Sequence, residues 1–348
     1  MSGVQIPPPL PKLTGIQMSL PKIAITMGDP AGIGPEIIVG AYNSGLSNLE
    51  CIPVIIGNAK FLHKAINLKK ADIEVVVIKD IKDVKSFNSN KIYCVEVNIQ
   101  YQDIEYALNS KYGGEFSYQC IKKAVDLNLG KQVQAICTAP ISKTSLHMAG
   151  YNYPGHTEML ADFTNVKEVS LMLMSPKLNV IHVTTHMGLI ESINKIDHGL
   201  VFRTIKRGRE VIKKILGKEP KIGVCAINPH AGENEVFGRG EEKNKILPAI
   251  KKSENLSWNV KGPLASDSLF YKAARGDFDL VVAMYHDQGH GPVKVLGIEH
   301  GINVTTGLPI IRTSVDHGTA FDIAGQGVAD ETNFLNAVKQ ALILIDKA

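Results

Sequence analysis

The sequence lacks the features that several large protein classes require. Its five cysteines are odd in number and include no CxxC pair, which argues against a disulfide scaffold. No apolar run approaches a membrane span, and prolines at positions 7–9 and 11 replace the continuous apolar stretch of a signal peptide. No GxxxxGK[ST] motif occurs, which excludes a P-loop. We therefore expect buried free thiols and a cytoplasmic protein with no membrane partner.

A strong charge imbalance is also missing. The 38 basic and 34 acidic residues leave a net charge of +4, and the lysines and arginines are scattered along the chain. This balance gives little support to nucleic acid as a partner and favours a small-molecule enzyme. A length of 348 residues exceeds one average domain, so two domains are expected. Residues 1–20 are expected to form a flexible leader without chemistry.

Strand-like and helix-like segments alternate along the rest of the chain. Strands are predicted at residues 22–27, 53–57, 73–78 and 135–138, and helices at residues 116–127, 201–216, 269–274 and 333–347. This alternation predicts an α/β fold with parallel-rich sheets and helices on both faces. Turn-rich segments at residues 150–155 and 301–307 suggest a first domain of residues 21–150 plus 305–348 and a second of residues 151–304.

Three segments share one pattern, an apolar run that ends in a histidine among turn-forming or polar residues. They are residues 180–186, 222–230 and 280–286, and they end in His186, His230 and His286. If the runs are neighbouring parallel strands, the three imidazoles lie at one rim of the sheet, where open α/β folds bind ligands. Three imidazoles suit a divalent metal. His182 and His290 compete for this role, and His182 is expected to be a core residue.

Other polar residues stand in conspicuous surroundings. His156 and Thr157 follow Gly155 at a predicted helix start, which favours an anion, although a plain Thr157 cap explains the pattern equally well. Three more lie in apolar or glycine-rich runs and need partners; they are Lys294, Asn303 and Arg312. A substrate phosphate or carboxylate would satisfy these residues, and internal salt bridges would do so as well.

Two loops complete the set of motifs. Residues 28–36 contain Gly32 and Gly34 after a strand, but Pro35 occupies the next position and removes an N–H, so the loop is not a standard dinucleotide cradle. Residues 313–325 are rich in glycine, serine and threonine and are suited either to a nucleotide or to a long structured surface loop.

Taken together, five motifs resemble the 4-hydroxythreonine-4-phosphate dehydrogenase family, PdxA. They are residues 28–36, 155–158, 228–233, 285–290 and 313–320, and the resemblance covers residues 22–345. It implies a two-domain fold like that of isocitrate and isopropylmalate dehydrogenases, with the active site in the cleft between the domains, and a homodimer whose active site is shared between subunits. It also implies metal ligands at His186, His230 and His286, and substrate contacts at His156, Thr157, Lys294, Asn303 and Arg312. The loop with His317, Gly318, Thr319, Ala320 and Asp322 is similar to a nucleotide-binding loop.

The resemblance also implies a reaction. Zinc, magnesium or cobalt would assist NAD- or NADP-linked oxidation and decarboxylation of 4-phosphohydroxy-L-threonine to 3-amino-2-oxopropyl phosphate, a step toward pyridoxal 5'-phosphate. Lys143 and Asp267 are candidates for proton transfer. Related chains act on threonate or erythronate 4-phosphate, and phosphate acyltransferases share the general fold, so both remain alternatives.

Overall fold

A computed structural model describes residues 20–84, 88–297 and 301–346. The predicted leader, residues 1–20, lies outside the described residues except for Leu20. All five cysteines are buried and unpaired, as expected. No helix among the residues described has the length and apolarity needed to cross a bilayer.

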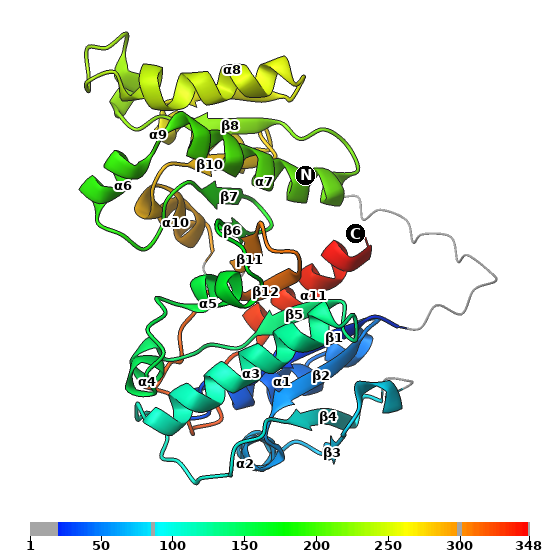
Figure 1. The fold of residues 1–348 in the computed structure, drawn as a ribbon. Helices are drawn as coiled ribbons and strands as arrows, with labels where there is room; N and C mark the ends of the chain where they lie inside the picture. The colour runs from blue at the N-terminus through cyan, green and yellow to red at the C-terminus, as the bar shows by residue number, and fades with distance from the viewer. Residues whose placement is uncertain (1–19, 85–87, 298–300, 347–348) are drawn as a thin grey trace, which may run out of the picture.

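Strands and helices alternate over most of the chain (Figure 1). The strands are β1 Lys22–Thr26, β2 Ile52–Gly57, β3 Glu74–Val77, β4 Lys91–Glu96, β5 Ala135–Thr138, β6 Ser170–Met174, β7 Asn179–His182, β8 Ile222–Cys225, β9 Val260–Leu264, β10 Leu280–Ala283, β11 Ile302–Thr306 and β12 Ile311–Val315. The α-helices are α1 Gly34–Asn43, α2 Ala59–Lys69, α3 Lys111–Leu129, α4 Lys143–Met148, α5 His156–Phe163, α6 Leu189–Lys195, α7 His198–Leu216, α8 Leu247–Asn255, α9 Ser266–Ala274, α10 His286–Val295 and α11 Thr332–Asp346.

The strands form one continuous sheet of 12 strands in the order β3-β4-β2-β1-β5-β12-β11-β6-β7-β10-β8-β9. Its pairings are parallel except at β12–β11, β11–β6 and β6–β7, in the middle of the sheet. The predicted α/β fold with a parallel-rich sheet is confirmed. The sequence pattern missed the antiparallel centre, where β11 pairs with a strand on each side and joins two sets of parallel strands into one sheet.

Helices surround both ends of this sheet. In Figure 1, α1 to α4 lie around the strands β1 to β5, and α6 to α9 lie around β7, β10 and β8. Strands β2, β5, β8 and β10 are buried along their whole length, because helices on both faces exclude water and favour near-continuous apolar runs. The expected domain boundary at residues 304 and 305 falls inside β11, and the division into two domains stays a prediction.

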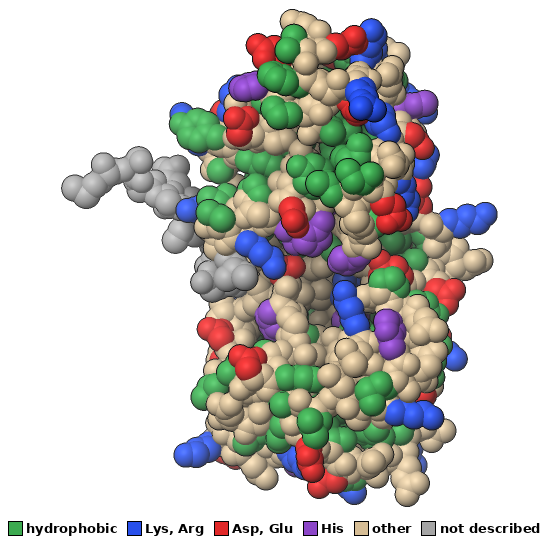
Figure 2. All heavy atoms as spheres, turned by 90° about the vertical axis from the view of Figure 1, so that its left-hand side faces the viewer, with side chains coloured by type: hydrophobic (Ala, Val, Ile, Leu, Met, Phe, Trp, Pro, Cys, Tyr) green, Lys and Arg blue, Asp and Glu red, His purple; other side chains and the backbone are tan. Residues whose placement is uncertain are grey.

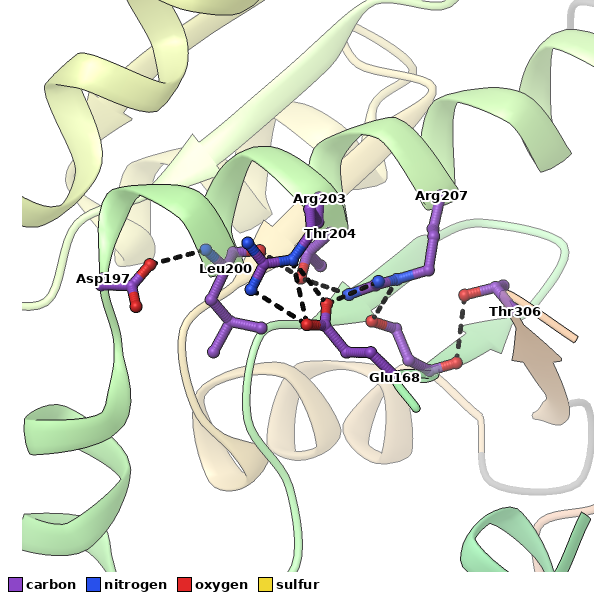
Figure 3. Close-up of polar contacts among 8 residues, drawn as sticks. Glu168, Asp197, Leu200, Arg203, Thr204, Arg207 and Thr306 are labelled. Carbon is purple, nitrogen blue, oxygen red and sulfur yellow. Dashed lines mark hydrogen bonds and ion pairs between the residues drawn. The ribbon is translucent and has the colours of Figure 1, made fainter. Parts of the chain in front are cut away.

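A network of charged and hydroxyl side chains attaches α7 to the antiparallel centre (Figure 3). Glu168 accepts hydrogen bonds from Arg203 Nε at 2.9 Å and forms an ion pair with Arg207 Nη1 at 2.6 Å. Arg207 Nε also donates to Ser170 Oγ in β6, and Thr306 Oγ1 in β11 donates to the carbonyl oxygen of Ser170. The network therefore holds one helix and two strands in fixed positions.

Candidate active site

A cavity of about 310 Å³ opens beside the antiparallel centre of the sheet. Figure 2 shows the corresponding face, with a hollow at mid-height where histidine and lysine side chains gather. Ten predicted site residues line the cavity: Lys143, His156, Thr157, His186, His286, Lys294, Asn303, Arg312, His317 and Gly318. The structure thus brings together residues from distant parts of the chain.

Buried polar atoms without a hydrogen-bond partner concentrate in this cavity. Among the described residues, five such atoms belong to side chains that line it: His156 Nε2, Glu158 Oε2, Asn303 Oδ1, Arg312 Nε and His317 Nε2. Buried polar groups in folded proteins are almost always paired, because an unpaired one costs about 1–3 kcal/mol. A polar ligand would satisfy several of them at once.

Arg312 is the central cation of the site. Its side chain is on β12, is 2% exposed, and donates to Thr305 Oγ1 at 2.9 Å and Thr138 Oγ1 at 2.7 Å. Burial lowers its pKa to about 10. No ion pair of Arg312 is present among the described residues, so the alternative of an internal salt bridge is wrong for this residue. A buried cation held only by hydroxyls is suited to an incoming anion.

His156 and Glu158 lie at the start of α5 and also line the cavity. The N-cap of this helix is Gly155, with no side-chain cap, so the alternative of a Thr157 cap is wrong. Burial, followed by the charges of Arg312 and Lys143, keeps the pKa of His156 well below its ordinary value, so this ring is neutral. Burial raises the pKa of Glu158, but contact with His186 and the charge of Lys143 outweigh it, and the carboxylate is ionised.

Lys294, Asn303 and Asp316 form another part of the wall. Lys294 Nζ lies 4.0 Å from Asp316 Oδ2, so for this lysine the internal ion pair is present, though long. Burial raises the pKa of Asp316, which weakens its hold on the lysine. Lys143, the first residue of α4, also lines the cavity. Glu158 and Asp316 are not among the predicted site residues, although Glu158 directly follows Thr157 and Asp316 directly precedes His317.

Two of the three predicted metal ligands face each other. The parallel strands β7 and β10 are neighbours, as predicted, and the rings of His186 and His286 lie 6.0 Å apart between centroids. His286 Nδ1 is 2.7 Å from Asp287 Oδ1, and His186 Nδ1 is 3.8 Å from Glu158 Oε1. A carboxylate at Nδ1 leaves Nε2 as the ligand atom, which is the usual arrangement of metal-binding histidines.

The third predicted ligand, His230, lies elsewhere in this chain. β8 pairs with β10 as predicted, but His230 is in a short turn after β8 with φ of 52°, and it is absent from the cavity lining. Its ring contacts Phe237, with centroids 6.1 Å apart. Among the residues that the structure describes, no group of three or more His, Cys, Asp or Glu side chains is arranged to hold a metal. Within this chain, two of the three predicted ligands therefore line the cavity and the third does not.

The predicted nucleotide loop begins at the cavity and leaves it. His317 and Gly318 line the wall, and a side chain at Gly318 would meet open space. Thr319 turns to the glycine-rich loop, where its carbonyl oxygen accepts a hydrogen bond from Ile33 at 3.1 Å. Asp322 is exposed, and Ala320 has φ of 44°. His317 and Gly318 are therefore accessible to a ligand in the cavity, whereas Thr319 is hydrogen-bonded to Ile33 at the start of α1.

Asp267, the second candidate for proton transfer, does not reach the cavity. It lies in the first turn of α9, is exposed, and its Oδ1 accepts a hydrogen bond from Ser268 at 2.7 Å.

His182 and His290, the two histidines that compete for the metal-ligand role, lie in different surroundings. His182 is buried in β7 as predicted, whereas His290 lines the cavity behind His286, with the two rings stacked at 3.7 Å.

Comparison with known proteins places this arrangement in a family. The family described as "Pyridoxal phosphate biosynthetic protein PdxA" matches residues 49–341. A D-threonate 4-phosphate dehydrogenase of Cupriavidus necator is 51% identical over 92% of this chain and 96% of its own length. A 4-hydroxythreonine-4-phosphate dehydrogenase of Trichlorobacter lovleyi is 39% identical over 92% of this chain and 96% of its own length.

Solved structures agree with the fold. A crystal structure of a 4-hydroxythreonine-4-phosphate dehydrogenase from Burkholderia phymatum is 51% identical and superposes with a TM-score of 0.82, covering 93% of this chain and 98% of that one. A β-decarboxylating dehydrogenase from Thermococcus kodakarensis, at 13% identity and a TM-score of 0.50, shares the fold alone and confirms the expected fold relationship. The protein is an enzyme that belongs to the PdxA family of dehydrogenases.

Proposed function

We propose that the enzyme oxidises D-threonate 4-phosphate with NAD or NADP, assisted by a divalent metal, and that carbon dioxide is then lost. The sequence analysis put 4-phosphohydroxythreonine first and threonate 4-phosphate second. The relative at 51% identity is named for threonate 4-phosphate and the one at 39% for hydroxythreonine phosphate, which supports the reverse order. Both molecules are four-carbon acids with a 4-phosphate and a hydroxyl at C3, so one cavity can accept either.

The buried guanidinium of Arg312, which is hydrogen-bonded to two hydroxyls and forms no ion pair within the described part of the chain, is the observation that carries this proposal. We assign it to the substrate phosphate, together with His156 and Thr157 at the start of α5. A helix N-terminus presents free N–H groups and a partial positive charge, which favours phosphate. The neutral His156 donates a hydrogen bond there without adding a further charge. Lys294 and Asn303, on the remaining wall, are then left for the carboxylate at the other end of the substrate.

His186 and His286 suit a divalent cation because each presents Nδ1 to a carboxylate. We propose that both bind one metal, such as zinc, magnesium or cobalt, and that His230 of a second copy of the chain completes the set. Bound there, such an ion would lower the pKa of the C3 hydroxyl of the substrate. Asp267, which is exposed in this chain, would act only if the second copy brings it to the site.

The chemistry assigned to the chain is proton transfer and orientation. In the proposed reaction Lys143 first releases its own proton and then accepts that of the C3 hydroxyl, and the C3 hydride passes to NAD(P)+. The C1–C2 bond of the resulting 3-keto acid then breaks, carbon dioxide leaves, and C2 takes up a proton. Threonate 4-phosphate would give dihydroxyacetone phosphate, and 4-phosphohydroxythreonine would give 3-amino-2-oxopropyl phosphate. The open space at Gly318 leaves room for the nicotinamide cofactor beside the loop that continues to Asp322.

A substrate panel tests the proposal. Purified enzyme is incubated with D-threonate, D-erythronate or 4-hydroxythreonine 4-phosphate, with NAD or NADP and with each metal, and NAD(P)H absorbance and released carbon dioxide are measured. We expect the highest kcat/KM with D-threonate 4-phosphate and loss of turnover after chelation. Higher efficiency with 4-hydroxythreonine phosphate would favour the second candidate. Absence of NAD(P)H with all three would overturn the proposal.

We also propose that the enzyme acts in the reducing cytoplasm, which the five buried free thiols support.

A further inference from the structure

Two buried histidines behind the cavity have no part in the proposed chemistry. His182, at the end of β7, is 1% exposed, and His290, in α10, is 7% exposed and lines the cavity. His182 Nε2 and His290 Nδ1 lie 3.1 Å apart. Side chains that are buried and polar usually serve a structural or functional requirement, since burial without a hydrogen bond is costly.

The partners of the two rings determine where their protons lie. His182 Nδ1 is 3.2 Å from the carbonyl oxygen of Leu171, which only accepts, so Nδ1 carries the proton and Nε2 has a lone pair. His290 Nδ1 faces this lone pair and, at 3.2 Å, the carbonyl oxygen of His286. Both of its partners are acceptors, so His290 also carries its proton on Nδ1. Its Nε2 is the one polar ring atom left, and it is an acceptor.

Gly289 is the residue that permits this contact. A Cβ atom at position 289 would collide with His182 Nε2 and would come within 2.9 Å of Val180 Cγ1. Glycine is unfavourable inside a helix by about 1 kcal/mol, yet it occupies the middle of α10. The close approach of α10 to β7 accounts for it. In the segment 286–290, His286 therefore lies at the cavity, and Gly289 leaves room for His182, which orients His290.

We propose that His182 is a positioning residue that holds His290 in the Nδ1-protonated form, so that His290 Nε2 accepts a hydrogen bond from the C2 substituent of the substrate. Lys294 follows His290 by one helical turn, so the two side chains lie on one face of α10. With Lys294 at the substrate carboxylate, His290 lies next to the adjacent carbon, which bears a hydroxyl or an ammonium group. This inference rests on the proposed function for the identity of the substrate.

Nitrogen-15 NMR of the full chain labelled at histidine tests the proton positions without any turnover. The His290 signals are identified by their loss in His290→Phe. We expect a non-protonated Nε2 in the native protein and in His182→Gln, whose amide can accept from His290 and donate to Leu171. We expect a mixture of both forms in His182→Leu, and in Gly289→Ala, which pushes the two rings apart. A protonated Nε2 in the native protein would overturn the assignment.

Kinetics with a matched analogue test the role of the acceptor. With D-threonate 4-phosphate, His290→Phe should raise KM about 10-fold, the effect of one lost hydrogen bond. With the 2-deoxy analogue, which lacks the donor, His290→Phe should change KM less than about 2-fold. His182→Leu should show part of the KM effect and His182→Gln should restore native values. The exposed His63→Gln is the control, with native kinetics. Equal penalties for both substrates would refute the assignment.

Two further outcomes distinguish this inference from a role of His290 as a metal ligand and from the proposed function. If Zn²⁺ alone shifts the His290 Nε2 signal as strongly as that of His286, His290 is a metal ligand and the inference is wrong. If no hydroxy acid phosphate is turned over but Nε2 is non-protonated, the proposed function fails while the positioning of His290 by His182 stands. With 4-hydroxythreonine phosphate, a similar penalty in His290→Phe would show that an ammonium group occupies the same position as the hydroxyl.

Discussion

At the scale of single residues, Arg312 offers the clearest separation between stability and function. Its burial without a carboxylate disfavours the free protein, and an anion removes that cost. Arg312→Met should therefore leave the melting temperature nearly unchanged. Loss of a charge-assisted pair costs about 2–5 kcal/mol, so KM for the phosphorylated substrate should rise at least about 30-fold.

Steady-state kinetics and thermal unfolding of the same preparations check this expectation. Arg275→Met is the matched control, because Arg275 lies at the end of α9 and bonds only to Tyr271 within that helix. The control should keep native KM. An unchanged KM in Arg312→Met would remove this side chain from the substrate site, and a large loss of stability would show that its bonds to Thr138 and Thr305 are mainly structural.

The residue types in the sequence predicted many of the residues that line the cavity, but they did not show which candidates would lie outside it. Lys294 and Arg312 were recognised because a cation in an apolar run needs a partner, and both line the cavity. His230 was recognised by the same histidine pattern as His186, yet it lies outside the cavity. The sequence pattern predicts that a strand ends in a histidine. The direction of the ring depends on the turn that follows, and the pattern does not predict the left-handed backbone conformation of His230.

At the scale of elements, the glycine-rich loop before α1 supports the loop after β12. A Cβ at Gly32 would lie 2.8 Å from the carbonyl oxygen of Thr319 and 2.9 Å from its Cβ. Gly32→Ala should displace residues 317–320, destabilise the protein by about 1–3 kcal/mol, and raise KM for NAD(P) several-fold. Gly188→Ala is the control, since its Cβ would meet no atom within 4 Å. Cofactor titrations at saturating substrate measure the effect, and an unchanged cofactor KM would separate this loop from nucleotide binding.

The attachment of α7 to the centre of the sheet should depend on pH. Burial raises the pKa of Glu168, but Arg203 and Arg207 outweigh it and bring the pKa below the ordinary value of 4.5. Because the folded-state pKa is the lower one, this stabilisation is complete above pH 4.5 and is lost as the pH falls through the folded value. Glu168→Gln should cost about 1 kcal/mol at pH 7, since the carboxylate is partly exposed, and less at pH 4.

Urea unfolding of the native protein and of Glu168→Gln at the two pH values measures this difference. Glu210→Gln serves as the control, because the carboxylate of Glu210 lies 3.9 Å from Lys206 on the exposed face of α7 and should contribute less than about 0.5 kcal/mol. A difference between the native protein and Glu168→Gln that stays constant with pH would show that packing, rather than charge, holds the helix.

Elements with a clear period were predictable, and those without one were not. The helix at residues 201–216 and the strands at residues 22–27 and 135–138 match α7, β1 and β5 within a few residues, because their apolar positions repeat along one helix face or in short buried runs. The antiparallel strand β11 was not recognised. It follows α10 in sequence. It pairs with β6, which lies more than 100 residues earlier, and with β12, which is the next strand.

At the scale of the whole molecule, we propose that a second copy of the chain covers the surface around the histidines. Exposed apolar side chains occur on α6 at Ile190 (74%), on α10 at Val295 (87%) and beside His230 at Phe237 (41%). Figure 2 shows hydrophobic side chains gathered above the hollow. Large exposed apolar patches mark interaction surfaces. A twofold dimer over this surface would bring His230 of one copy to the pair formed by His186 and His286 of the other.

Complementation between inactive variants tests this shared site. His230→Ala keeps His186 and His286, and His186→Ala keeps His230. A mixed dimer therefore has one site with all three native histidines and one site that lacks both His186 and His230. After random exchange of subunits, half of the dimers are mixed, and the activity should recover to about a quarter of the native value. His186→Ala mixed with His286→Ala is the control. Both residues belong to the same half of each site, so every site lacks one of them and no activity returns. No recovery in the first pair despite exchange of subunits would exclude the shared metal site, and recovery in the control pair would show that His186 and His286 of one chain serve different sites.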